Sequence, residues 1–386
     1  GYWLRPASGV SHADEAWVIG LASWKGQVLD RVQLLLQSKE NNMDYFVGLD
    51  VSLRSAAVCV IDGDGRTVFE RTVACDIDDI SGRLADLSAC NIRIGFEAGA
   101  MSQHLFLGLQ AAGFDVVCME ARQVNAALSA MRNKTDKTDA RGIANVLRSG
   151  WFNPVHMKSR EAHAVRALLS SRKAVQRKCI DLANEIRGLF RIFGLRLPPR
   201  IEQASFDEKV RPLIEADADL SHALLPLLDA RAVLFSTYQE LDRRVKRLAS
   251  HDAICLRFMA IPGVGPIAAL TFKAAVDDPK RFTSSRTVAA HFGLTPRRYQ
   301  SGEMDNPGRI SKAGDADVRS ALYAAANAMM MRSVASSEIK SWGLRLMRRK
   351  GRRRAVVAVA RKLAVVMHRM WADNTEFRQR PLEAAA

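Results

Sequence analysis

Four carboxylates occupy positions where a metal-dependent site for phosphodiester chemistry can form. Asp50 lies near the end of the apolar run YFVGLDVS, and Glu97 ends the run IRIGFE, so each acid belongs to the end of a predicted strand. Asp136 and Asp139 lie three residues apart, which puts both side chains on one face of a predicted helix. Converging carboxylates repel one another unless a divalent cation neutralises them, and such oxygen ligands select Mg²⁺ or Mn²⁺. Two such ions can activate the attacking oxygen and stabilise the leaving oxygen in phosphodiester cleavage.

Each of these acids also has a purely structural interpretation. A solvent-exposed strand end accounts for either of the first two. A helix N-cap accounts for either of the last two, in competition with Thr135 and Thr138. The structural interpretation is favoured for any single residue, whereas the whole set, in this order on a basic chain, favours a metal site. Lys134 and Lys137, on either side of Asp136, are predicted to hold phosphates.

A second reactive group is Ser301, in the segment FGLTPRRYQSGE. A serine that attacks a phosphodiester needs donors for the developing charge and a group that accepts its proton. The cations nearby in sequence, which are predicted to contact nucleic acid, are Arg297, Arg298, Arg309 and Lys312. His291 is the nearest imidazole, but the sequence does not identify it as the proton acceptor. Taken alone, Ser301 is more typical of a turn, and Ser311 is the competing nucleophile.

The segment IPGVGP lies between two predicted helices. Gly263 and Gly265 allow backbone amides to approach an anionic oxygen at a helix N-terminus, as in helix-hairpin-helix DNA-binding proteins. A tight turn in an all-helical domain is the alternative. The basic chain that follows favours binding to a nucleic-acid backbone.

The net charge indicates the class of partner. The chain has 57 Lys and Arg against 41 Asp and Glu, which gives a formal net charge of +16 and an isoelectric point near 9.9. Such an excess favours a phosphate backbone, since binding releases condensed counterions, although a solvated surface is the alternative. From Ser341 to Trp371 there is no acidic residue, while many are Arg or Lys. This clustering favours nucleic acid.

The sequence argues against two further classes of protein, those that span a membrane and those held together by zinc or disulfides. No apolar run approaches the roughly 18–20 residues that cross a bilayer, so no membrane-spanning segment is predicted. The 6 cysteines are scattered without a C-x-x-C pair, which is typical of reduced thiols rather than of a zinc site or a disulfide framework. We therefore expect a cytoplasmic protein, associated with the nucleoid.

The acids need a sheet to hold them. The pattern predicts three strands, a helix, a strand, a helix, a strand and a helix over residues 45–131, and a last helix that begins near Asp136. A strand meander that leads into crossover units makes a mixed sheet with helices on its faces. In that sheet the ends of the first and fourth strands are neighbours.

The remainder is predicted to be helical. Apolar residues recur in heptads over residues 168–193 and again over residues 220–248, which predicts coiled-coil helices that form an antiparallel hairpin or a dimerising arm. The fold class is thus α/β followed by all-α. The predicted segments are an N-terminal extension or leader (1–42), the α/β domain (43–152), the coiled-coil region (153–252), and a mainly helical serine-bearing domain with a basic C-terminal tail (253–386).

The succession GLDVS, GFEAG, KTDKTDA, IPGVGPIAA, FGLTPRRYQSGE and RISKAGD resembles the DEDD transposases of the insertion-sequence-110 family, also called bridge-RNA-guided recombinases. The resemblance covers residues 43–331, whereas residues 1–42 match nothing in that family. It implies a RuvC-type, ribonuclease-H-like domain whose acids fall on Asp50, Glu97, Asp136 and Asp139. It further implies a coiled coil and then a transposase domain, in which Ser301 becomes covalently joined to DNA.

The resemblance also implies the partners. These are double-stranded donor and target DNA and a structured bridge RNA, encoded beside the gene, that pairs with both DNAs. A homo-oligomer, a dimer or a tetramer, is expected, in which the acids of one protomer meet the serine of another.

Two other functions fit part of the sequence. A Holliday-junction-resolving nuclease has the same fold and acids, but it has no use for the segment Gly263–Asp315. A non-catalytic RNA- or DNA-binding scaffold would not need all four acids. An ATPase of the actin and sugar-kinase fold would need later glycine-rich phosphate loops, which the sequence lacks.

Overall fold

The structure, a computed structural model, describes residues 44–87, 91–129, 135–198, 200–301 and 304–378. Contacts divide the chain into two compact units, with the boundary after Met157. The extension predicted over residues 1–42 and the predicted phosphate ligand Lys134 lie outside the described residues. Within the second unit, helices from both sides of residue 252 share one core. The domain boundary predicted at that residue stays a prediction.

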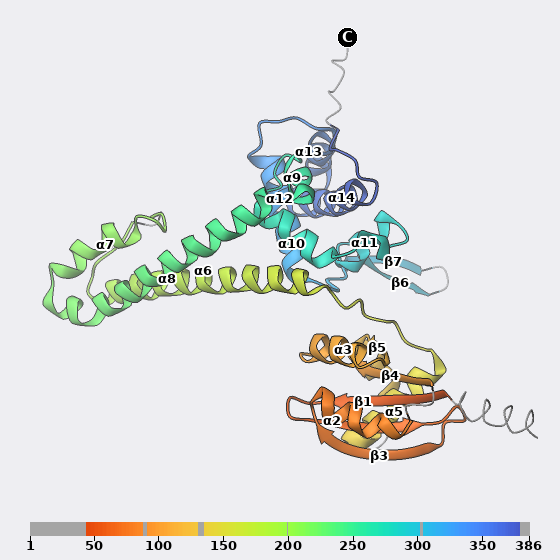
Figure 1. Cartoon of the computed structure of the whole chain (residues 1–386). Helices are drawn as coiled ribbons and strands as arrows, with labels where there is room; N and C mark the ends of the chain where they lie inside the picture. The colour runs from red at the N-terminus through yellow and green to blue at the C-terminus, as the bar shows by residue number, and fades with distance from the viewer. Residues whose placement is uncertain (1–43, 88–90, 130–134, 199, 302–303, 379–386) are drawn as a thin grey trace, which may run out of the picture. The chain divides into compact units, whose positions relative to one another are not determined.

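The first unit is built on a five-stranded mixed sheet (Figure 1). Its strands are β1 (Asp44–Val51), β2 (Ser55–Ile61), β3 (Thr67–Ala74), β4 (Asn91–Glu97) and β5 (Asp115–Met119). They lie in the order β3-β2-β1-β4-β5, with β1 antiparallel to β2 and parallel to β4. This is the mixed sheet that the sequence predicts, and it fits a ribonuclease-H-like domain.

Helices cover both faces of the sheet. The helices are α2 (Ile77–Leu84), with the 3₁₀ turn η1 (Ala85–Leu87), α3 (Ser102–Ala111), α4 (Ala121–Leu128) and α5 (Asp136–Ser149). Leu49 packs in one core with α2 and α3, whereas Cys59 packs on the other face against α5. Alternate residues of a strand point to opposite faces. The even-numbered residues of β1 therefore face α5.

Gly48 allows α5 to lie directly on β1. A Cβ atom at Gly48 would be 2.1 Å from the backbone oxygen of Ala140 and 2.5 Å from the backbone nitrogen of Ala144. No side chain fits in that space, so only glycine permits this approach of a helix to a strand.

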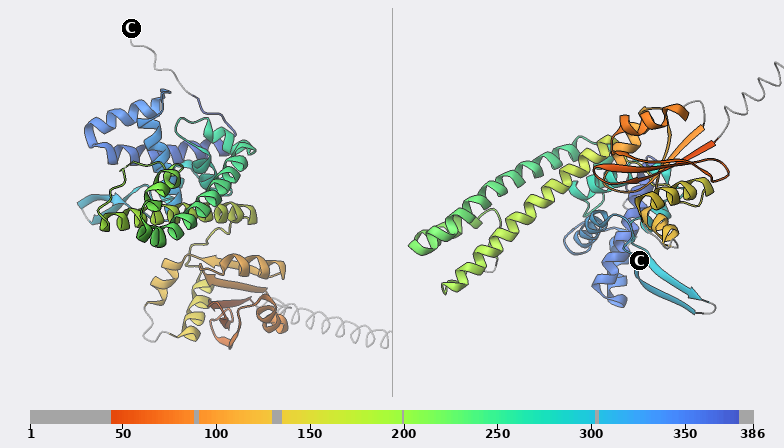
Figure 2. Two further views of the ribbon diagram at one scale, coloured as in Figure 1. Left: turned by 90° about the vertical axis from the view of Figure 1, so that its left-hand side faces the viewer. Right: turned by 90° about the horizontal axis from the view of Figure 1, so that it is seen from below.

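The second unit begins with a long helical hairpin. Its helices are α6 (Arg160–Ile192), α7 (Phe206–Glu215) and α8 (Ala218–Ser250). Figure 2 shows α6 and α8 side by side along most of their length. The predicted heptad seam is wrong at Phe193 and Leu248, which are 46% and 42% exposed. Phe193 lies just beyond the last residue of α6. Near the end of α8 the buried residues are Val245 and Ala249, since a helix of 3.6 residues per turn drifts away from a strict seven-residue repeat.

The seam of this hairpin contains two buried arginines. Arg172 donates from Nε to Asp242 Oδ1 at 2.7 Å and from Nη2 to the hydroxyl of Tyr238 at 2.9 Å. Arg231, which is 0% exposed, donates to Asp207 Oδ1 at 2.7 Å. Buried charges of this kind need such partners, so Arg172 fixes the pairing of α6 with α8, and Arg231 fixes that of α7 with α8.

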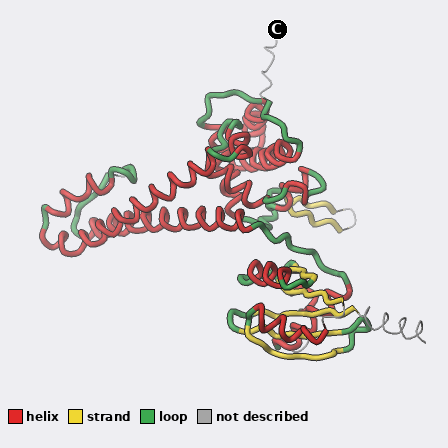
Figure 3. Tube along the Cα trace, in the orientation of Figure 1, coloured by secondary structure: helices red, strands yellow, loops and turns green. Residues whose placement is uncertain are grey.

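The rest of the second unit is a helical core with one two-stranded ribbon (Figure 3). Its elements are α9 (Ala253–Met259), α10 (Pro266–Val276), η2 (Pro279–Arg281), α11 (Ser285–His291), β6 (Pro296–Ser301), β7 (Met304–Ile310), α12 (Ala316–Met331), α13 (Glu338–Lys350) and α14 (Arg352–Ala372). The segment around Ser301, a residue that the sequence makes typical of a turn in a mainly helical domain, forms the antiparallel ribbon β6–β7. None of the helices described is long and apolar enough to cross a membrane.

The predicted basic tail is also wrong, because the chain from Ser341 to Trp371 belongs to two packed helices. Val356, Val359 and Leu363 of α14 are fully buried in the main core of the unit. These apolar residues recur at helical spacing between the cations, so the helix buries one side and exposes its charges on the other.

We predict that Gly48→Ala destabilises the first unit by about 1–3 kcal/mol or more, because α5 must move away from β1. Hydrogen exchange of the β1 amides in increasing urea measures this change. The control is Gly82→Ala in α2, where a Cβ atom meets nothing within 4 Å, and it should stabilise by about 0.5–1 kcal/mol. Equal effects of the two substitutions would contradict the packing described.

Candidate catalytic site

Asp50 is the residue before the last of β1, and Glu97 is the last residue of the neighbouring strand β4. The register of the parallel pair β1–β4 matches Leu49 with Phe96, so the two acids occupy the next position on each strand. Both are half-buried, and both line a cavity of about 320 Å³ at the carboxyl edge of the sheet. The sequence prediction that these two strand ends are neighbours is confirmed.

The direction of α5 brings its first turn to the same edge. Near the start of β1, Arg148 in the last turn of α5 donates from Nη1 to the carbonyl oxygen of Gly63 at 3.1 Å. Further along β1, Gly48 lies against Ala140. The helix therefore runs opposite to β1, and its N-terminus lies toward the strand end that carries Asp50.

The start of α5 is capped by threonines. The hydroxyl of Thr135 accepts a hydrogen bond from Thr138 N at 3.3 Å, and the hydroxyl of Thr138 accepts one from Thr135 N at 2.9 Å. This reciprocal capping box leaves Asp136 and Asp139 as first-turn residues rather than N-caps. Asp136 and Lys137 are exposed, and Asp139 is half-buried.

Sequence reasoning missed a residue that orients one of the acids. Asn125 of α4 donates from Nδ2 to Glu97 Oε1 at 3.0 Å and to the carbonyl oxygen of Ala121 at 2.9 Å. The hydrogen bond ties the Glu97 carboxylate to the helix that covers its face of the sheet. The signal in the sequence was a polar residue directly after the buried Val124.

The four acids share one edge and one face of the sheet, but they do not form a closed ligand set. Among the described residues, no three His, Cys, Asp or Glu side chains are close enough together to hold a metal ion. The donors are all carboxylate oxygens, which suits a hard divalent cation. Asp50, Glu97 and Asp139 would be the first ligands of such an ion.

The cysteines do not compete for this role. Those described are free thiols. Burial raises the pKa of Cys59 to about 12, and that of Cys255 to about 12. A thiol of this kind stays protonated at neutral pH in the metal-free chain, and no cysteine of the described residues belongs to a group of three possible ligand side chains.

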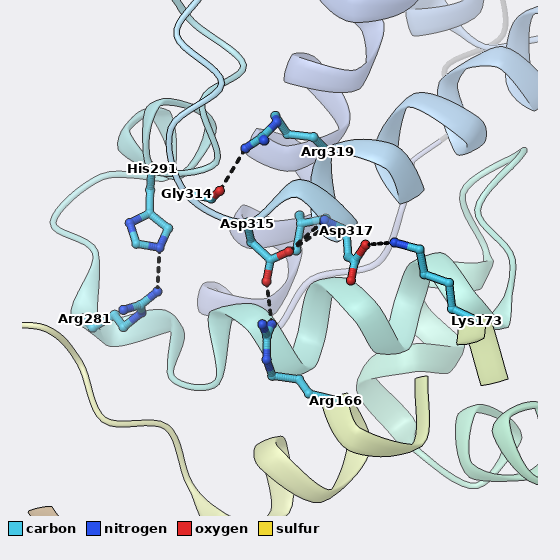
Figure 4. Close-up of polar contacts among 9 residues, drawn as sticks. Arg166, Lys173, Arg281, His291, Gly314, Asp315, Asp317 and Arg319 are labelled. Carbon is cyan, nitrogen blue, oxygen red and sulfur yellow. Dashed lines mark hydrogen bonds and ion pairs between the residues drawn. The ribbon is translucent and has the colours of Figure 1, made fainter. Parts of the chain in front are cut away.

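The second predicted reactive group, Ser301, is the last residue of β6, where it pairs in register with Met304 of β7. The base of this ribbon is fixed by Arg319 of α12, which donates from Nη1 to the carbonyl oxygens of Phe292 at 3.2 Å, Ala313 at 2.6 Å and Gly314 at 3.1 Å. Figure 4 shows its contact with Gly314.

The chain segments on either side of the ribbon also fit closely together. Gly314 has a φ of 66°, and a Cβ atom there would lie 2.2 Å from the carbonyl oxygen of His291. The neighbouring Asp315 caps α12 and accepts a hydrogen bond from Arg166 of α6 at 2.5 Å (Figure 4). Burial acts to raise the pKa of Asp315, but the hydrogen bond and charge of Arg166 outweigh it, so the pKa lies below its ordinary value.

The groups predicted around Ser301 have different surroundings. Ser311, the competing nucleophile, accepts a hydrogen bond from Ala313 N at 3.4 Å and so has a role in the turn. Arg297 donates to the carbonyl oxygen of Ser311 at 3.2 Å. Arg309 and Lys312 are exposed, and the side chain of Arg298 lies outside the described part of the chain.

His291 is not positioned as a simple base. Its Nε2 lies 3.1 Å from Nη2 of Arg281 (Figure 4). A guanidinium group only donates hydrogen bonds, so Nε2 must accept this one. The lone pair at that nitrogen is therefore engaged within the second unit.

The two glycines of the IPGVGP turn also differ. Gly263 has a φ of 88°, and a Cβ atom there would lie 2.5 Å from Met329 N, so packing against α12 explains this glycine. Gly265 precedes α10, and a Cβ atom there would meet nothing within 4 Å. Binding of a nucleic-acid backbone by this turn stays a prediction. Of its two glycines, Gly265 has the space around it that such binding needs.

A mixed sheet of this order, with acids at the carboxyl ends of β1 and β4 and in the first turn of α5, defines an acidic-site enzyme of the ribonuclease-H-like class. Residues 47–194 match a family model described as a transposase, and residues 255–342 match one described as the transposase IS116/IS110/IS902 family. The chain belongs to the IS110 family of transposases. It is a DNA transposase that depends on divalent metal.

Relatives extend over most of the chain. The transposase for insertion sequence element IS1111A of Coxiella burnetii is 28% identical over 353 residues, which are 87% of this chain and 92% of that protein. A probable family 20 transposase of Pseudomonas aeruginosa is 30% identical over 251 residues, which are 64% of this chain and 74% of that protein. The transposase for IS1328 of Yersinia enterocolitica is 27% identical over 246 residues, or 64% of this chain and 74% of that protein.

We predict that Arg319→Ala loosens the base of the β6–β7 ribbon, because three carbonyl oxygens lose a charged donor. The loss of stability should be about 1.5–3 kcal/mol. The amides of Ser311 and Lys312, which donate to residues before the ribbon, should exchange hydrogen faster. Arg332→Ala, at the exposed C-cap of α12, is the control and should leave exchange unchanged. Unchanged exchange in Arg319→Ala would show that other contacts hold the ribbon.

Proposed function

We propose that this transposase is an RNA-guided recombinase that cuts and rejoins DNA with an acidic metal site and a serine nucleophile. The acids would be Asp50, Glu97, Asp136 and Asp139, and the nucleophile would be Ser301. The observation that supports the acids most directly is their common location at the carboxyl edge of β1 and β4, on the face covered by α5.

In the proposed reaction, Oγ of Ser301 attacks the scissile phosphorus. A new bond forms between Oγ and phosphorus while the bond from phosphorus to the leaving deoxyribose oxygen breaks. The serine proton leaves and the departing oxygen gains one. A hydroxyl of the second DNA later attacks the same phosphorus and releases Ser301, which restores the hydroxyl.

The acids would hold Mg²⁺ or Mn²⁺, which supplies positive charge beside the scissile phosphate when it is bound. Asn125 keeps one Glu97 oxygen in place by its hydrogen bond, and the capping box keeps the first turn of α5 formed. The chain itself thus orients two of the acid-bearing segments.

The proposed reaction needs groups from both compact units. The acids belong to the first unit and Ser301 to the second. We propose that the site is completed in a homo-oligomer, a dimer or a tetramer, where acids of one protomer meet Ser301 of another. The net charge of +16 supports a nucleic-acid load that includes donor DNA, target DNA and a structured guide RNA. The protein would act in the cytoplasm, at the nucleoid.

We predict that Asp139→Asn lowers DNA cleavage in Mg²⁺ by about 10²-fold or more, since losing a ligand removes several kcal/mol of transition-state stabilisation. Binding to the same labelled DNA should change little, because the basic surface is intact. Asp64→Asn, on an exposed turn of the same unit, is the control and should cleave normally. Near-normal cleavage by Asp139→Asn would overturn the metal-site assignment.

We predict that Ser301→Ala abolishes the covalent protein–DNA adduct on denaturing gels, because it removes the attacking oxygen. Ser311→Ala is the matched control; it loses one turn hydrogen bond, worth about 0.5–1.5 kcal/mol, and should keep the adduct. The reverse pattern would assign the nucleophile to Ser311. An adduct retained by both variants would exclude both serines, and metal-dependent cleavage without any adduct would favour a water-using nuclease such as a junction resolvase.

A further inference from the structure

Helices α13 and α14 carry a dense, exposed positive surface. Each of its members has a long cationic side chain that faces solvent. We call this set the α13–α14 basic surface, and it consists of Arg345, Arg348, Arg349, Lys350, Arg352, Arg353, Arg354, Arg361, Lys362 and Arg369. The two helices meet at Gly351, so six of these cations flank one turn.

The surface is rigid because the other side of α14 is buried. Val356, Val359, Leu363 and Met367 of α14 are fully buried in the main core of the second unit. On the exposed side, Arg354, Arg361 and Arg369 fall within an arc of about 80° and extend over about 22 Å of the helix. A fixed row of cations is suited to a rigid, extended polyanion.

The start of α14 places cations where they do not stabilise the helix. The N-terminus of a helix is the positive end of its macrodipole, which disfavours cations there. Arg352, Arg353 and Arg354 occupy this first turn, which holds no acidic residue and has no side-chain cap. By contrast, Arg348 and Arg349 in the last turn of α13 suit the negative end of that helix. The first-turn arginines of α14 thus oppose stability, which points to an external anion.

Few of these charges are neutralised by the described residues. Arg369 pairs with Asp373 at 3.1 Å, and Arg352 donates to Asn327 Oδ1 at 2.9 Å. In the part of the chain that the structure describes, Arg353, Arg354 and Arg361 have no ion-pair partner.

The surface shares its core with the ribbon that carries Ser301. Phe292 and Leu294, directly before the ribbon, lie in the same hydrophobic cluster as the buried side of α14. His368 of α14 lies 2.9 Å from the hydroxyl of Ser285 in α11, the helix that leads to the ribbon. Helix α14 is therefore packed against the chain that leads into the ribbon, and a polyanion held on α14 would lie in the same compact unit as Ser301.

We infer that the α13–α14 basic surface binds the phosphate backbone of the duplex DNA that Ser301 attacks. This inference rests on the proposed function for its choice of DNA, and on the core that α14 shares with Phe292 and Leu294, directly before the ribbon. The contacts would be to phosphates rather than to bases, and they would hold DNA of any sequence in place for the reaction.

The test uses the full chain with four substitutions together, Arg353→Gln, Arg354→Gln, Arg361→Gln and Lys362→Gln. The control removes the same four charges from exposed positions of α7 and α8, by Lys209→Gln, Arg243→Gln, Arg244→Gln and Arg247→Gln. Affinity for a 30-base-pair duplex of arbitrary sequence is measured at several salt concentrations, in parallel with an RNA hairpin of equal stem length.

The α14 variant should bind the DNA duplex more weakly, with a log–log salt slope smaller by about two to four units, while the control changes by less than one. Its thermal stability should not fall, because Arg353 and Arg354 oppose the helix dipole, and Arg361 and Lys362 are exposed residues in the middle of the helix. An unchanged slope, an equal loss in the control, or a loss for RNA alone would overturn the inference. The Ser301→Ala variant should bind the duplex with normal affinity. If Ser301 is not the nucleophile, this variant still forms the covalent adduct on denaturing gels, and that failure is distinct from an unchanged salt slope.

Discussion

The close contact between β1 and α5 at Gly48 is the constraint on which the acidic site depends. A helix whose backbone touches the strand has little freedom to slide, so its first turn is held at one level of the sheet. The same face of the sheet then carries Asp50, two residues further along β1, and Glu97 on the neighbouring strand. A larger residue at Gly48 would leave every acid in the chain but would remove the geometry that brings them to one edge.

In the second unit, arginine side chains hold segments that are far apart in the sequence. Arg319 joins three carbonyl oxygens at the base of the ribbon, and Arg231 is fully buried in the helical hairpin with Asp207 as its partner. Such groups are costly to bury unless each finds its partners, so they favour one arrangement over others. Such preorganisation would suit the proposed attack of Ser301 on a phosphate, which needs one orientation.

Much of the first unit could be predicted from its sequence, and much of the second could not. The strands of the first unit are short apolar runs bounded by turn residues, so their succession along the chain and the neighbouring ends at Asp50 and Glu97 could be predicted. The dense cations of α14 concealed its apolar spacing, which made a core helix resemble a tail. Proline, glycine and asparagine between Pro296 and Ile310 are typical of turns, although the described residues pair as the antiparallel ribbon β6–β7. The engagement of His291 by Arg281 depends on tertiary contact and leaves no local signal.

The central claim is that the carboxyl edge of β1 and β4, together with the first turn of α5, binds divalent metal. The most direct measurement is anomalous diffraction at the manganese edge from crystals of the full chain grown with Mn²⁺. The account predicts a peak at roughly 2.0–2.3 Å from carboxylate oxygens of Asp50 and Glu97, with Asp139 or Asp136 completing the set. A peak elsewhere, or none at this edge in saturating Mn²⁺, would contradict it.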